Sequence, residues 1–118
     1  MLKLNHKKLA VWEKSLKLIK EVYKLTNMLP KEEKYVLTSQ LRRASISVAS
    51  NIAEGASRKS VNDRKRFYEI SRSSSVEIDT QIEICKLLEY VKENELVHLD
   101  AELNNVFALL TAMINNTK

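Results

Sequence analysis

The fold of this chain is decided by one alanine- and serine-rich stretch, SQLRRASISVASNIAEGAS, which runs from Ser39 to Ser57. Its larger apolar residues recur every three or four positions, the spacing of side chains that share one face of an α-helix. They are Leu41, Ala44, Val48 and Ile52. Most of the other residues are small, so a second helix can approach the backbone closely. The stretch therefore predicts the tightly packed central helix of a bundle.

The sequence on either side predicts three more helices. Pro30 fits the first turn of a helix better than an interior, so it separates the first helix from the central one. Ser60 and Asp63 have the spacing of an N-terminal cap, which begins a third helix. A seam of leucines predicts a fourth helix after a short break at residues 92–94. The predicted helices cover about residues 7–28, 31–57, 61–91 and 95–115.

Length and composition restrict the fold and the location. A chain of 118 residues with one glycine and one proline predicts a single all-α domain over residues 1–118, an antiparallel up-down-up-down four-helix bundle. Its only cysteine, Cys85, excludes an internal disulfide and falls in an apolar stripe, so we expect a buried thiol. The first residues lack the apolar run of a signal peptide, and no run is long enough to span a bilayer. We expect a cytoplasmic protein without a membrane partner.

The first predicted helix carries two apolar stripes where a monomeric bundle needs one. The first stripe consists of Leu9, Trp12, Leu16, Ile19 and Tyr23, and we assign it to the core. The second stripe consists of Val11, Leu18, Val22 and Leu25. It contacts either another subunit or a deeper part of the same bundle. We favour the first alternative, and we add Ile46 of the central helix to the expected oligomer interface.

Basic residues gather at the junction of the second and third helices. The net charge of +5 is uneven, because residues 1–60 hold 13 Lys and Arg against 5 Asp and Glu. Five of the cations are clustered, namely Arg58, Lys59, Arg64, Lys65 and Arg66. Together with the free N–H groups that begin the third helix, they form a candidate phosphate-binding surface for RNA or DNA, without base readout. An ordinary solvated turn is the alternative.

Two adjacent arginines of the central helix are candidates for ion pairs within the bundle. Arg42 and Arg43 lie about 100 degrees apart on a helix, so they cannot serve the same contact. Arginine favours paired, partly desolvated carboxylates, and we expect at least one of them to pair across a helix interface. We name Arg43 and Glu54 as a structural ion pair, with Glu69 and Glu77 as other candidate carboxylates.

The residues that could carry catalysis are few. His6 and His98 have no partner at metal-ligand spacing, and there is no Glu-x-x-His pair and no Cys/His cluster. One glycine cannot build a phosphate-binding loop. We expect no catalytic residues, no metal, no cofactor and no enzymatic activity.

Three motifs resemble a known family. The segments LAVWEK (residues 9–14), VYKLT (residues 22–26) and LPKEEKY (residues 29–35) are similar to the opening of the bacterial four-helix-bundle proteins encoded in intervening sequences of 23S rRNA genes. LTSQLRRA (residues 37–44) and NIAEG (residues 51–55) match the most diagnostic segment of that family. The family pattern usually has a proline shortly before its NIAEG run, where this chain has Val48, Ala49 and Ser50.

The resemblance implies a bundle that assembles into a ring, commonly a homopentamer, with no established enzymatic activity and an undefined cellular role. A related branch, the accessory variability determinant of diversity-generating retroelements, binds nucleic acid and partners a reverse transcriptase. We therefore expect a homo-oligomer with sequence-independent affinity for RNA or DNA. The alternative is an oligomeric protein–protein adaptor or accessory factor, for example to a reverse transcriptase, that does not itself bind nucleic acid.

Overall fold

A computed structural model describes all 118 residues of the chain, and its regular structure is entirely helical. The α-helices are α1 (Ala10–Thr26), α2 (Leu37–Ser57), α3 (Val61–Leu87) and α4 (Val97–Asn116). Three short 3-10 helices lie before or between them, namely η1 (Asn5–Lys8), η2 (Lys31–Glu33) and η3 (Glu93–Glu95). The all-α single bundle predicted from the sequence is confirmed.

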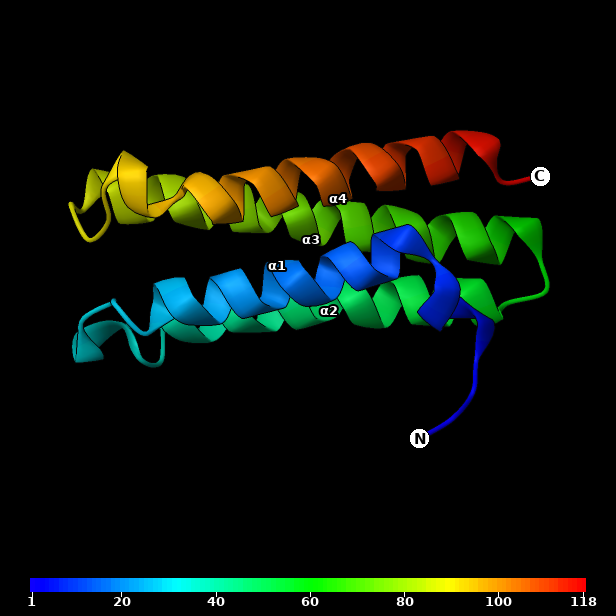
Figure 1. The fold of residues 1–118 in the computed structure, drawn as a ribbon, viewed down its shortest axis with the longest axis horizontal. Helices are drawn as coiled ribbons and strands as arrows, with labels where there is room; N and C mark the ends of the chain where they lie inside the picture. The colour runs from blue at the N-terminus through cyan, green and yellow to red at the C-terminus, as the bar shows by residue number, and fades with distance from the viewer.

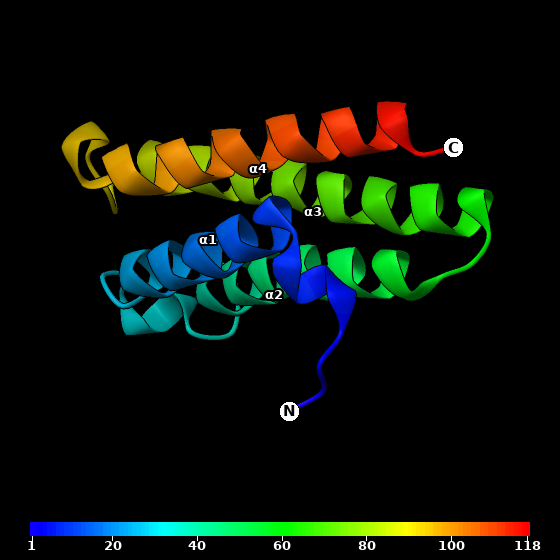
Figure 2. The ribbon, with the colours of Figure 1, turned by 45° about the vertical axis from the view of Figure 1, so that its right-hand side comes forward.

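The four helices form two layers, with α1 and α2 in one and α3 and α4 in the other (Figures 1 and 2). The connections that contain η2 and η3 lie at one end of the bundle. The α2–α3 connection and the C-terminus lie at the other end, and the N-terminal tail leaves the side of the α1–α2 layer. α1 and α3 therefore run in the same direction along the bundle. The molecule measures 44 × 28 × 20 Å. None of its helices has the length and apolarity needed to cross a membrane.

The interface between α2 and α3 is built from small side chains, as the alanine- and serine-rich stretch predicts. Leu41, Val48 and Ile52 of α2 are fully buried, and α2 continues without interruption where the family pattern has a proline. Ser71 of α3 is also fully buried and donates a hydrogen bond of 2.7 Å from Oγ to the carbonyl oxygen of Val48. The buried hydroxyl thereby finds an acceptor without holding the helices apart.

The predicted roles of the two α1 stripes are wrong, because the structure reverses them. Four residues assigned to an oligomer interface lie instead in the core of the chain, namely Val11, Leu18, Val22 and Leu25. The stripe assigned to the core is only half-buried, and Leu16 is 42% exposed. Valine and leucine gain most from complete burial, whereas Trp12 and Tyr23 can keep their polar atoms at the edge of the bundle. Ile46 is 45% exposed, so it alone of that set stays available to a partner.

The largest differences from the predicted helix boundaries are the start of α2 and the end of α3. α2 begins at Leu37 rather than at residue 31, since residues Lys31–Glu33 form the separate η2 turn. α3 ends at Leu87 rather than at residue 91. Glu89 adopts a left-handed conformation (φ 62°), and the next amide, that of Tyr90, bonds to the carbonyl oxygen of Cys85. This is a Schellman cap formed without the glycine that normally marks it, so the sequence carries no clear signal for it.

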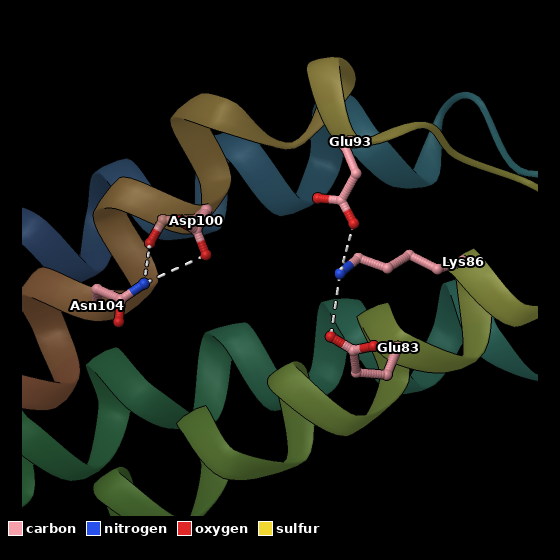
Figure 3. A network of polar contacts seen from close by, with 5 residues as sticks. All are labelled: Glu83, Lys86, Glu93, Asp100 and Asn104. Atoms are coloured by element: carbon pink, nitrogen blue, oxygen red, sulfur yellow. Dashed lines mark hydrogen bonds and ion pairs between the residues drawn. The ribbon is translucent and has the colours of Figure 1, made fainter.

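Lys86, near the end of α3, forms ion pairs with Glu83 of the same helix and with Glu93 of η3 (Figure 3). Its ammonium group lies 2.9 Å from a carboxylate oxygen of Glu93 and 3.1 Å from one of Glu83. The hydrogen bonds to Glu93 and to Glu83 raise the pKa of Lys86 above its ordinary value. The protonated form therefore stabilises this connection.

We predict that the Lys86 contribution to stability disappears only in strong alkali. The folded chain holds the proton more tightly, so the contribution is complete below the unfolded pKa of about 10.4 and is lost as pH rises through the higher folded pKa. The Lys86→Met variant should have a lower urea midpoint than the wild type at pH 8. The difference should shrink towards pH 12.

Burial also raises the pKa of Tyr68, and a hydrogen bond to Glu33 raises that of Tyr90. Both tyrosines are present in the wild type and in the variant, so the difference in urea midpoint between the two proteins reports on Lys86. A difference in urea midpoint that stays constant from pH 8 to pH 12 would contradict the prediction.

Candidate nucleic-acid interface

The five basic residues predicted to bind nucleic acid lie together where α2 ends and α3 begins. The connection is short, and Ser60 caps α3 by accepting a hydrogen bond of 3.2 Å from the backbone N–H of Asp63. The predicted start of the third helix is thus confirmed. The remaining free N–H groups of the first turn give this end of α3 a partial positive charge.

Two of the five cations are occupied by interactions within the chain. Arg58 pairs with Glu54 at 3.0 Å. Arg64 donates hydrogen bonds to the carbonyl oxygens of Arg58 (3.2 Å) and Lys59 (2.7 Å), and to that of Lys118 (3.3 Å). The guanidinium of Arg64 therefore holds the connection in place and joins it to the C-terminus. Its main role is structural.

The other three cations make no ion pair and no hydrogen bond with the chain through their side chains, namely Lys59, Lys65 and Arg66. The guanidinium of Arg66 lies 5.6 Å from the ring centre of Phe67, and that of Arg58 lies 4.9 Å from it. The ring thus limits the positions of two flexible arginines without neutralising them. Unpaired cations of this kind are suited to phosphate groups.

The beginning of the chain holds further basic residues outside this site. η1 contacts both α1 and α2, and the tail that precedes it leaves the side of the α1–α2 layer (Figures 1 and 2). Lys3 and Lys8 are exposed, and Lys7 donates a hydrogen bond to the carbonyl oxygen of Leu2. His6 is buried and its ring meets that of Trp12 edge-on at 5.1 Å, which anchors η1. The charge asymmetry of the sequence signals these lysines, but their position requires the fold.

The predicted ion pair between Arg43 and Glu54 does not form. Both residues lie on α2, where eleven residues separate them by about 16 Å along the helix. Glu54 pairs with Arg58, and Arg43 is exposed without an ion pair. Arg42 also lacks a carboxylate. It donates hydrogen bonds to Thr26 Oγ1 (2.8 Å) and Asn27 Oδ1 (3.0 Å).

The other side chains that could act as nucleophiles or metal ligands are either buried or far apart. Cys85 is fully buried, as predicted, and its burial, reinforced by the nearby charge of Glu33, raises the pKa of its thiol. His98 is exposed at the start of α4. No three His, Cys, Asp or Glu side chains gather closely enough to hold a metal ion.

The fold and this site define an all-α four-helix protein with a concentration of unpaired cations at one end. The chain belongs to the 23S rRNA-intervening sequence protein family, whose sequence pattern matches residues 7–112. The resemblance drawn from the motifs is thereby confirmed. A structure of a protein of unknown function from the S23 ribosomal protein family of Bacteroides thetaiotaomicron superposes with a TM-score of 0.82, at 23% identity, over 91% of this chain and 100% of that one. No curated protein matches the chain.

Proposed function

We propose that this protein is a non-enzymatic, homo-oligomeric antiparallel bundle that binds RNA or DNA through the phosphate backbone. The observation that supports nucleic-acid binding is the group of unpaired cations Lys59, Lys65 and Arg66 beside the N-terminus of α3. The acidic residues nearest in sequence are Glu54, which Arg58 already neutralises, Asp63 and Glu69. Binding of this kind depends on counterion release and is not specific for sequence.

Self-association is supported by the apolar surface that the chain leaves exposed. Leu16 and Ile46 are exposed and Ile19 and Tyr23 are half-buried, and together they form an apolar strip on the outer side of α1 and α2, where Arg42 stacks on the Tyr23 ring. Exposed apolar patches of this kind mark contact surfaces between proteins. In a ring such as a pentamer, each copy would add its basic end to one rim, and the shared rim would bind a polyanion with higher avidity.

We predict that reversing two of these charges weakens nucleic-acid binding strongly. The double variant Lys59→Glu, Lys65→Glu removes two unpaired cations and places two anions where phosphates would lie. Its affinity for a single-stranded RNA, measured by fluorescence anisotropy, should fall by about tenfold or more at low salt. The slope of log K against log salt should also decrease by about 0.7 for each phosphate that is no longer neutralised.

The matched control changes the net charge equally at the opposite end of the bundle. Lys31 and Lys34 are exposed at or just after η2, and neither forms an ion pair. The variant Lys31→Glu, Lys34→Glu should retain most of the affinity. Equal losses of affinity in both variants would mean that only net charge matters. An absence of binding by the wild type at low salt would leave the adaptor as the better function.

A further inference from the structure

Two opposite faces of the bundle are incompletely covered. The first, the α1–α2 face, is the outer surface of the layer formed by α1 and α2 (Figure 1). It presents Leu16, Ile19 and Tyr23 of α1, and Ile46 lies one turn beyond Arg42, whose guanidinium stacks on Tyr23 at 4.5 Å. The second, the α3–α4 face, is the outer surface of the other layer. A depression between its helices is lined by Ser75, Val76, Asp79, Leu103, Asn104 and Phe107.

The charges on the two faces are complementary in sign and in spacing. Three charged residues of α1 are exposed beside its apolar stripe, at successive separations of seven and four residues: Glu13, Lys20 and Lys24. Three charged residues of α3 repeat these separations with the opposite signs: Arg72, Asp79 and Glu83. Four of the six have no ion pair within the chain, namely Glu13, Lys20, Arg72 and Asp79.

The directions of the helices allow all three pairs to form at once. α1 and α3 both run towards the end that holds η2 and η3 (Figure 1). Two copies placed side by side with their long axes parallel therefore bring α1 of one copy alongside α3 of the next in the same direction. Equal spacing along two parallel helices keeps the register from the first pair to the last.

Arg72 is the residue in the α3–α4 face that most lacks a partner. Its guanidinium lies 4.6 Å from the ring centre of Phe107, and its Nε is buried without a hydrogen-bond acceptor. A buried donor without a partner is costly and rare. A carboxylate supplied from outside the chain would neutralise this charge.

We propose that the α1–α2 face of one copy docks on the α3–α4 face of a second copy, with Glu13 beside Arg72 and Lys20 beside Asp79. Leu16 then lies at the level of Ser75, beside the depression between α3 and α4. This inference rests on the self-association proposed above and names the surfaces that meet. The interface joins two different faces, so it is head-to-tail, and each copy keeps one free face of each kind for a further copy. The charges set the register, and the apolar strip supplies most of the affinity.

A charge exchange tests the inference in the full chain without nucleic acid. Sedimentation velocity should show that Glu13→Arg and Arg72→Glu each raise the dissociation constant between copies by about tenfold or more, because each places like charges side by side. The double variant Glu13→Arg, Arg72→Glu restores an opposite pair and should recover most of the wild-type association. Circular dichroism identifies any variant that loses its helices.

Glu77→Arg is the matched control, because Glu77 is exposed on α3 but lines a different depression, between α2 and α3. It should leave the association unchanged. Single variants that associate like the wild type, or a double variant no better than the singles, would overturn the proposed interface, whatever the outcome of RNA binding. A wild type that stays monomeric at all concentrations would overturn both this interface and the proposed self-association.

Discussion

Replacing Leu18 by Glu should unfold the chain rather than release folded monomers. Leu18 is completely buried in the core beside Val22, so the variant would place a carboxylate among apolar groups with no counter-ion. The removal of the leucine side chain alone costs about 2–5 kcal/mol, and the buried charge adds to it. The total approaches the whole stability of a typical domain, about 5–15 kcal/mol. Circular dichroism should show a large decrease in helix content at 25 °C.

The matched variant is Leu16→Glu, two residues away on the same helix. Leu16 is 42% exposed, so its replacement should change the free energy of unfolding by about 1 kcal/mol or less. It should instead weaken the association between copies, because it places a charge in the exposed apolar strip. A folded Leu18→Glu variant together with an unfolded Leu16→Glu variant would show that the other stripe faces the core.

Replacing Gly55 by Ala should destabilise the chain, although alanine is the better helix former. A Cβ at position 55 would lie 2.7 Å from Cε1 and 2.9 Å from Cδ1 of Tyr68, whose ring is buried against α2. Helix propensity favours alanine by about 1 kcal/mol. Displacing a buried ring typically costs about 1–3 kcal/mol, and the backbone of α3 must move with it. We therefore expect a net decrease of up to about 2 kcal/mol in the free energy of unfolding, measured in urea.

Ser57→Ala, on the exposed last turn of the same helix, is the control and should have an effect within about 0.5 kcal/mol. A Gly55→Ala variant with a higher urea midpoint than the wild type would show that the Tyr68 ring can move aside without lowering the free energy of unfolding. In that case helix propensity would be the dominant effect, and the close approach of α2 and α3 would not require glycine.

The number of helices and most of the core were predictable, because local patterns are unambiguous where a helix has a single apolar stripe. On α4, Leu99, Leu103 and Val106 belong to a single apolar seam, and all three are buried. α1 offers two stripes with nearly the same period, and the hydrophobic pattern alone cannot rank them. The packing of α1 against α2 and α4 makes the choice, which depends on side-chain shape rather than on polarity.

In the candidate site, too, local sequence patterns predicted some features and tertiary packing decided the others. The cluster from Arg58 to Arg66 is local in sequence, so the sequence pattern alone reveals it. The role of each cation also depended on three-dimensional neighbours. Arg64 is engaged by carbonyl oxygens as distant in sequence as that of Lys118, while the side chain of Lys59 is exposed and unpaired.

By itself, the sequence determined the family, the helical class and the location of the basic cluster, since each depends on short-range patterns of spacing and composition. Only the tertiary structure decided which face of α1 is buried, which arginines are already paired and which charges face outwards. Those properties depend on packing between helices distant in sequence, and such packing is set by the shape and charge of all the elements that meet.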